Sequence, residues 1–214
     1  MINLFKKDRQ TTSILSADSS IEKLESYKSL RLQILHLLAD TEGSSGKVIA
    51  ITGIDTLSSA GMNLAISFGQ LGKKVLLIEA DLKEPVLNQI FKSAGEPGLT
   101  DVIKGSVGLA QALKMQEKEG ISFLPSGARV GDSSLVFSAP GMKDLIDSAR
   151  QTFGYIFINL PSAASDSDAA VIGGMTDGYL LFVRHKVTRK RELEKAIRLL
   201  ERTDGRILGI VYLQ

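Results

Sequence analysis

Uninterrupted apolar segments alternate with helix-like segments from residue 47 onward, and this alternation constrains the fold more than any other feature. The apolar segments run over 47–52, 74–80, 120–127, 155–161, 177–184 and 206–213. The helix-like segments between them cover 62–72, 84–95, 142–154 and 188–205. Continuous apolar runs indicate strands that are covered on both faces, and strand–helix repetition places such strands side by side in a parallel sheet. The sequence therefore predicts an α/β fold with a doubly wound, mostly parallel sheet and helices on both faces.

The chain is expected to form one domain after a short arm. Its 214 residues suffice for one complete core. Residues 1–18 are polar and without periodicity, which predicts a flexible N-terminal arm before a single domain over 19–214. Ser19 and Glu22 form the pattern of a capping box at the start of a helix. The apolar side of this helix is expected to consist of Ile21, Leu24, Leu30, Ile34, Leu37 and Leu38.

The composition excludes several kinds of site. The chain has no cysteine, which excludes disulfides, thiol catalysis and zinc–thiolate sites. His36 and His185 have no metal-ligand companions nearby, so no metal site is expected. The N-terminus lacks the apolar core of a signal peptide, and no run approaches the ~20 apolar residues of a membrane span. We therefore expect a cytoplasmic protein, and the net charge of +2 gives no reason to expect a nucleic-acid partner.

Four segments should meet at one crevice, because ligands bind beyond the carboxyl ends of the strands in such sheets. They are 51–65, 79–85, 125–132 and 159–169. The first occupies the place of a phosphate-binding loop, whose pattern GxxxxGK[ST] supplies backbone N–H groups and a lysine for the phosphates. Here Gly53 ends the strand, and no lysine or arginine occurs between Val48 and Gly72. The simplest interpretation is an ordinary strand-to-helix turn capped by Ser58 or Ser59, although the positive end of a helix leaves weak binding of ATP, ADP or phosphate open.

Several motifs in chain order resemble the bacterial tyrosine kinases (BY-kinases) of capsule and exopolysaccharide synthesis. These kinases are P-loop NTPases related to the ParA and MinD ATPases. The motifs are "SYKSLRLQI", "GKKVLLIEADLKEP", "EPGLTDVIKGS", "ISFLPSGA", "INLPSAASDSDA" and "TDGYLLFVRHKVTR", and the resemblance covers about residues 20–214. It implies a P-loop NTPase-like fold. It also implies that Gly53, Asp55, Thr56, Leu57, Ser58 and Ser59 correspond to the nucleotide-binding loop.

The sequence departs from the family pattern in the motifs that bind nucleotide and metal in the family. The loop lacks the Gly-Lys-Ser/Thr triplet, and Glu79 replaces the first aspartate of the second motif, whose second aspartate is Asp81. Asn159 replaces the acid of the third motif, and a neutral amide is a weak ligand for Mg²⁺. The four tyrosines (Tyr27, Tyr155, Tyr179 and Tyr212) do not form the tyrosine-rich tail of the autokinases. We therefore expect no catalytic residue and no cofactor, and we expect Glu79, Asp81 and Asn159 to be vestigial equivalents of the family's catalytic residues. Asp166 and Asp168 are expected to have a capping role.

The expected function runs through contacts. Glu25, Lys28 and Arg31 correspond to a helix that mediates self-association in the family; a solvated ion-pair stripe is the alternative. The resemblance also implies a membrane-spanning polysaccharide co-polymerase, or chain-length protein, as a partner in trans, which would recruit the chain to the inner face of the membrane. The leading hypothesis is a catalytically inactive regulatory or scaffold component. A weakly active kinase or ATPase and a ParA/MinD-type positioning protein stay open. The basic run 184–206 is read as a charged helix exterior, with a partner or nucleic-acid face as the alternative.

Overall fold

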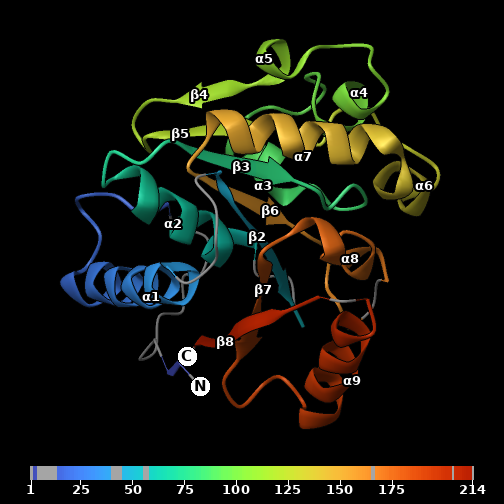
Figure 1. Ribbon diagram of the computed structural model, residues 1–214. Coiled ribbons are helices and arrows are strands. Elements are labelled where there is room, and N and C mark those ends of the chain that lie inside the picture. Colours follow the sequence, from blue (N-terminus) through green and yellow to red (C-terminus); the bar gives the residue numbers. More distant parts are fainter. Residues whose placement is uncertain are drawn as a thin grey trace.

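An eight-stranded sheet forms the centre of the molecule (Figure 1). The computed structural model describes residues 2–3, 14–39, 45–54, 58–164, 167–203 and 205–213. The strand order is β1-β8-β7-β2-β6-β3-β5-β4, and only β4 pairs antiparallel. The strands are β1 Ile2–Asn3, β2 Lys47–Gly53, β3 Val75–Glu79, β4 Lys114–Gln116, β5 Ile121–Leu124, β6 Tyr155–Asn159, β7 Gly178–Arg184 and β8 Ile207–Leu213. The doubly wound, mostly parallel α/β fold predicted from the apolar runs is confirmed.

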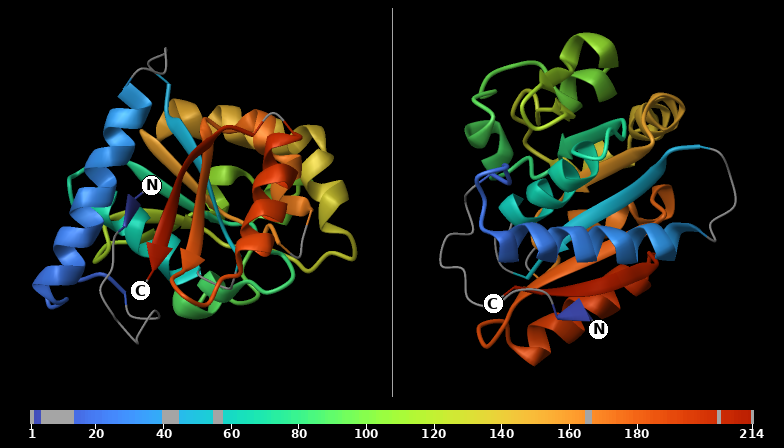
Figure 2. Two further views of the ribbon diagram at one scale, coloured as in Figure 1. Left: turned by 90° about the horizontal axis from the view of Figure 1, so that it is seen from below. Right: turned by 90° about the vertical axis from the view of Figure 1, so that its left-hand side faces the viewer.

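Helices cover both faces of the sheet. Helices α1 (Ile21–Ala39) and α2 (Ser58–Gly69) lie on one face, and α7 (Pro140–Thr152) and α9 (Lys190–Glu201) lie on the other (Figure 2). Shorter helices fill the connections: α3 Val86–Ile90, α4 Leu99–Ile103, α5 Leu109–Ala112, α6 Ser133–Ser138, α8 Asp168–Val171 and a 3₁₀ turn at Gly173–Met175. The helix expected over 84–95 is thus reduced to α3, and α4, α5, α6 and α8 were not anticipated.

Two apolar layers explain the continuous apolar strands. Successive side chains of a strand point to opposite faces, so Phe157 of β6 packs with the α1–α2 layer while Ile156 and Ile158 pack with the α7–α9 layer. All three are fully buried. Both faces of β6 must therefore be apolar, and its polar residue falls at the strand end, at Asn159.

The predicted N-terminal arm is partly wrong. Ile2 and Asn3 pair with β8 as a parallel edge strand. Leu15 is buried, and its backbone N–H donates to Asn63 Oδ1 at 2.7 Å. These two contacts attach parts of 1–18 to the domain, because a polar segment can still contribute backbone hydrogen bonds and single apolar side chains. Residues 1 and 4–13 lie outside the described residues.

The start of α1 also differs from the expectation. The helix begins at Ile21, and Ser20 Oγ accepts from the Lys23 backbone N–H at 3.3 Å. Ser19 Oγ instead accepts from the Ser16 backbone N–H at 3.0 Å in the preceding turn. Ile21 is 81% exposed and so does not belong to the apolar side of α1, on which Leu30, Ile34 and Leu38 are buried.

Candidate functional site

Glu79 and Asn159 meet at the carboxyl ends of two neighbouring strands. Glu79 is the last residue of β3, Asn159 is the last residue of β6, and the two residues are partners in the parallel register. The Asn159 side-chain amide donates from Nδ2 to Glu79 Oε1 at 2.7 Å. The structure therefore brings these two predicted site residues together at the predicted edge of the sheet.

The Glu79 carboxyl is closed in by further hydrogen bonds. Its Oε1 also accepts from the Asp81 backbone N–H at 3.1 Å, and its Oε2 accepts from the Leu87 backbone N–H at 2.8 Å. The residue has no exposed surface. Burial disfavours the ionised form, and it raises the pKa of Glu79 to about 8, although the three N–H donors act in the opposite direction.

This arrangement does not fit a magnesium ion bound with phosphate. Mg²⁺ is bound through carboxylate oxygens, water and phosphate oxygens, usually with several waters retained. At this edge the Asn159 side chain presents an N–H group to Glu79, and the buried carboxyl already accepts three hydrogen bonds. Within the described ranges, no group of three or more metal-ligating side chains is found. Hydrogen bonds of the Glu79 carboxyl thus connect the ends of β3 and β6 with the start of α3.

The strand-to-helix loop beside this pair is held by the loop that follows β6. Thr52 Oγ1 donates to the Pro161 carbonyl at 2.7 Å, and the Ala163 backbone N–H donates to the Gly53 carbonyl at 3.2 Å. Ser162 Oγ donates to the Ile54 carbonyl at 2.8 Å. As predicted, Gly53 ends β2, whereas Asp55, Thr56 and Leu57 lie outside the described residues.

The two serines of the predicted cap are inside α2. The helix begins at Ser58, followed by Ser59, which is buried. Neither residue therefore stands at the position before the helix, where an N-cap belongs. Because that position falls on Leu57, the identity of the cap lies outside the described part of the loop.

The remaining acidic residues of the crevice hold local structure. Asp81 Oδ1 accepts from the Glu84 backbone N–H at 2.9 Å. Asp168 is buried and connects two helices, since it accepts from Ser133 Oγ of α6 and forms an ion pair with Lys83 Nζ at 3.6 Å. Asp168 is the first residue of α8 and follows the N-cap position, which is Ser167, so Asp168 is not the N-cap of this helix. Asp166 lies outside the described residues.

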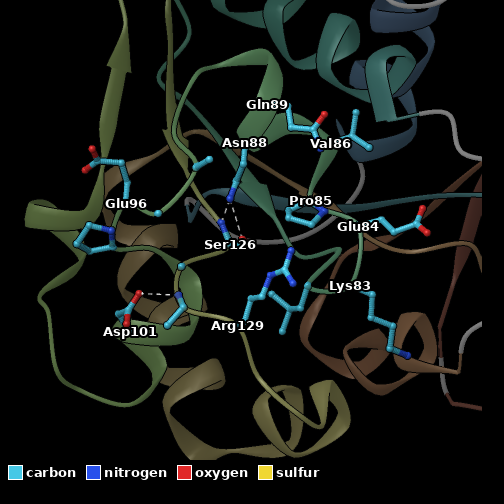
Figure 3. Close-up of a pocket in the computed structure, with 16 residues that line it drawn as sticks. Lys83, Glu84, Pro85, Val86, Asn88, Gln89, Glu96, Asp101, Ser126 and Arg129 are labelled. Atoms are coloured by element: carbon cyan, nitrogen blue, oxygen red, sulfur yellow. Dashed lines mark hydrogen bonds between the residues drawn. The ribbon is translucent and has the colours of Figure 1, made fainter.

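A cavity of about 640 Å³ opens beside this crevice (Figure 3). Its walls come from 82–86, 88–89, 94–97 and 126–129, with Asp101 at one end. Asn88 and Ser126 form one wall through two hydrogen bonds of 2.8 and 3.1 Å. Gly98 fixes the approach of this wall to α4, because a Cβ there would lie 2.1 Å from the Pro125 carbonyl oxygen. The volume is within the range of ligand pockets in proteins.

Arg129 is the charged side chain that points into the cavity in Figure 3. Its side chain forms no hydrogen bond or ion pair with any residue in the described ranges, and Lys83 and Arg129 also line a second, smaller cavity of about 270 Å³. By contrast, Glu96 is paired with Lys114 at 2.7 Å, and Asp101 Oδ2 accepts from the backbone N–H groups of Gly98 and Ala128. The segment 125–132 was predicted to reach the crevice, but Arg129 was not singled out, because an arginine in a loop carries no motif.

The predicted charged stripe on α1 is wrong for Arg31. Glu25 and Lys28 are exposed and form an ion pair of 3.1 Å, as the solvated alternative requires. Arg31 is only 8% exposed, and its Nη1 donates to the Ser67 carbonyl of α2. Six residues advance a helix by about 240° at 3.6 residues per turn, so Arg31 points away from Glu25 and toward α2. Arg31 therefore does not lie on the exposed side of α1 with Glu25 and Lys28, and self-association through this helix stays a prediction.

No helix in the ranges that the structure describes is both long enough and apolar enough to cross a membrane.

The chain has relatives among curated proteins, although no protein-family model matches it. It is 28% identical over 187 residues to the tyrosine-protein kinase YwqD of Bacillus subtilis, covering 87% of this chain and 79% of YwqD. It is 29% identical over 195 residues to the tyrosine-protein kinase CpsD of Streptococcus pneumoniae serotype 4, covering 89% and 84% of the two chains. It is 27% identical over 193 residues to the succinoglycan biosynthesis transport protein ExoP of Rhizobium meliloti, covering 87% of this chain and 24% of ExoP.

Solved structures share the fold. The chimerical protein CapA2B2 superposes with a TM-score of 0.86 at 22% identity, covering 98% of this chain and 91% of that one. The kinase domain of the Escherichia coli tyrosine kinase ETK superposes with a TM-score of 0.82 at 24% identity, covering 88% of this chain and 74% of that one. MinD of Pyrococcus horikoshii complexed with Mg-ADP gives 0.64 at 22% identity, with 78% and 70% covered. The architecture is thus that of bacterial tyrosine kinase domains and MinD-like P-loop NTPases.

Proposed function

From its similarity to the bacterial tyrosine kinases, we propose that this chain is a non-catalytic regulatory or scaffold relative of those enzymes. Its pathway would be the synthesis and export of a capsular polysaccharide or exopolysaccharide, since one relative is a succinoglycan biosynthesis transport protein. The chain would act through contacts with its partners and would not transfer phosphate.

The hydrogen bond from Asn159 to Glu79 is the observation that supports this proposal most strongly. Phosphoryl transfer depends on positioning and on electrostatic stabilisation by metal ions and cations. Here the buried Glu79 carboxyl accepts N–H groups from within the protein, and its raised pKa favours the neutral form. The sequence also offers no lysine or arginine between Val48 and Gly72 to neutralise a transferring phosphoryl group.

A phosphotransfer assay tests the proposal. The full chain is incubated with Mg·ATP, alone and with a tyrosine-containing polymer, beside an active tyrosine kinase of the family as a positive control. We expect no phosphotyrosine and no ADP above the level of a boiled sample. Phosphotyrosine formed by the wild-type chain and lost in a variant at the crevice, such as Asn159→Leu, would overturn the proposal.

A weakly active kinase or ATPase is the second candidate, and the cavity supports it. Lys83 and Arg129 line the cavity next to the crevice and would supply positive charge from outside the phosphate-binding loop. If this candidate is right, Arg129→Gln abolishes a measurable turnover, whereas Lys118→Gln, an exposed substitution elsewhere, leaves that turnover unchanged. If the non-catalytic proposal is right, neither variant differs from the wild type, because there is no turnover to lose.

The proposed partner is a membrane-spanning polysaccharide co-polymerase bound in trans at the inner face of the cytoplasmic membrane. The similarity to a transport protein of which this chain spans about a quarter supports this proposal. Co-purification of the full chain with such a protein from solubilised membranes tests it. Failure of the two proteins to co-purify when both are present in the same cells would contradict the partner without bearing on catalysis.

A further inference from the structure

Helix α9 carries four basic residues at regular helical spacing. Arg191, Lys195, Arg198 and Arg202 follow the spacing i, i+4, i+7 and i+11, with Arg202 directly after the last helical residue. At about 100° per residue these positions fall within an arc of roughly 60° on the helix surface. We call these four residues the α9 basic stripe, which extends over roughly 16 Å at 1.5 Å per residue.

The α9 basic stripe faces solvent. All four residues are exposed, while Ala196 and Leu200 on the opposite side of the helix are buried in the core. In Figure 1, α9 lies at the end of the sheet away from β4 and α4. None of the cavities described above is lined by a residue of α9. The stripe therefore lies on the solvent-exposed side of α9, outside both of these cavities.

The charge of this surface is largely uncompensated. Glu194 lies 4.0 Å from Arg198 and 3.8 Å from Lys190, at the limit of ion pairing, and Lys195 donates to the Ala164 carbonyl at 3.1 Å. Within the described residues, the side chains of Arg191 and Arg202 make no hydrogen bond or ion pair. The sequence from 184 to 206 has nine basic and four acidic residues, a net charge of +5, whereas the whole chain has +2. The rest of the chain is therefore net acidic.

We infer that the α9 basic stripe docks on the surface of a membrane that contains anionic phospholipid. An exposed row of cations fits a planar anionic surface, because each cation can contact a separate headgroup and a flat surface requires no complementary pocket. The neighbouring loop adds Lys186 and an exposed apolar side chain, Val187, which is 61% exposed. Between 184 and 206 there is no Phe, Tyr or Trp, the side chains on which single-stranded nucleic acids stack. The inference does not rest on whether the crevice binds nucleotide.

Vesicle binding of the full chain tests the inference. Each basic residue close to an anionic membrane contributes roughly a fivefold change in partitioning. The variant Arg191→Gln/Arg202→Gln should therefore bind phosphatidylglycerol-containing vesicles about 25-fold more weakly than the wild type. The matched control is Lys104→Gln/Lys118→Gln, which removes the same charge from exposed positions after α4 and after β4 and should change binding by less than about twofold. Circular dichroism verifies that both variants are folded.

The outcomes separate the alternatives. The inference predicts that the protein sediments with anionic vesicles and little with pure phosphatidylcholine vesicles. Added salt should release the protein from the anionic vesicles, since the Debye screening length falls to a few ångströms near 1 M. Equal weakening by both double variants would show that only net charge matters and would overturn the stripe. Absence of vesicle binding would overturn the inference. If the wild type also bound double-stranded DNA and the α9 double variant did not, the stripe would instead be a nucleic-acid surface.

Discussion

The buried carboxyl of Glu79 makes the stability of this protein depend on pH, and Glu79→Gln isolates that dependence. Burial raises the pKa of Glu79 to about 8 in the folded state, against about 4.3 for a glutamate in an unfolded chain. Between these two values the folded state binds more protons than the unfolded state does. The contribution of this group to the free energy of unfolding is therefore fully present below about pH 4. It falls as the pH rises from about 4 to about 8, and above about pH 8 it no longer changes with pH.

The size of the effect follows from the pKa difference. Each pKa unit corresponds to about 1.4 kcal/mol, so the full window amounts to about 5 kcal/mol, of which about half is lost between pH 5 and pH 7. Glutamine cannot titrate. At low pH the substitution should lower the free energy of unfolding by about 1–3 kcal/mol, because the amide N–H₂ of glutamine would face N–H groups that now donate to the Glu79 carboxyl. The variant should consequently lose less stability than the wild type as the pH rises from 5 to 8.

Urea unfolding of the wild type and Glu79→Gln at a series of pH values measures this difference. Glu84→Gln, an exposed glutamate in the same segment, is the matched control and should follow the wild type at every pH. A constant difference between wild type and Glu79→Gln from pH 5 to pH 8 would refute the reasoning. It would mean that Glu79 stays ionised in the fold and that its three N–H partners outweigh its burial.

Three further substitutions test other parts of the structure. Asn159→Asp places a second carboxyl against Glu79 and should lower the free energy of unfolding by about 3 kcal/mol at pH 7. The variant should not hydrolyse ATP, and measurable hydrolysis would contradict the claim that the crevice does not bind nucleotide. Arg31→Ala should cost about 2–4 kcal/mol in urea unfolding and leave the oligomeric state by light scattering unchanged, whereas a shift to monomer at unchanged stability would restore the interface assignment. Gly98→Ala should lower the melting temperature, while Gly131→Ala, where a Cβ would meet nothing within 4 Å, should not; equal effects would contradict the close approach to Pro125.

The fold was predictable because its signals are local. Both faces of the central strands are buried, so the apolar runs had to be continuous, and the polar residues that interrupt them mark the strand ends. The segments that begin at Glu79 and Asn159 were identified in this way, and the resemblance to the bacterial tyrosine kinases singled out these two residues. Their meeting followed from the rule that parallel strands end at the same edge, although the hydrogen bond between them could not be known from the sequence.

The parts that the sequence did not reveal depend on tertiary contacts. Arg31 was grouped with Glu25 and Lys28 by their spacing and by the resemblance to the family's helix motif, and only the packing of α1 on α2 shows that it is buried beside Ser67. The pairing of Ile2–Asn3 with β8 depends on a distant strand edge, and a two-residue strand has no periodicity to detect. The cavity at Arg129 likewise arises from three separate loops.

Calorimetric titration of the full chain with Mg·ATP tests the central claim most directly. The claim is that the crevice at Glu79 and Asn159 no longer serves nucleotide, and it predicts no saturable heat up to about millimolar ATP, which corresponds to roughly −4 kcal/mol. The same result is expected without Mg²⁺, because the hydrogen-bonded pair of Glu79 and Asn159 is not expected to hold a metal ion that would add affinity. A micromolar dissociation constant that requires Mg²⁺ and disappears in the Asn159→Leu variant would contradict the claim.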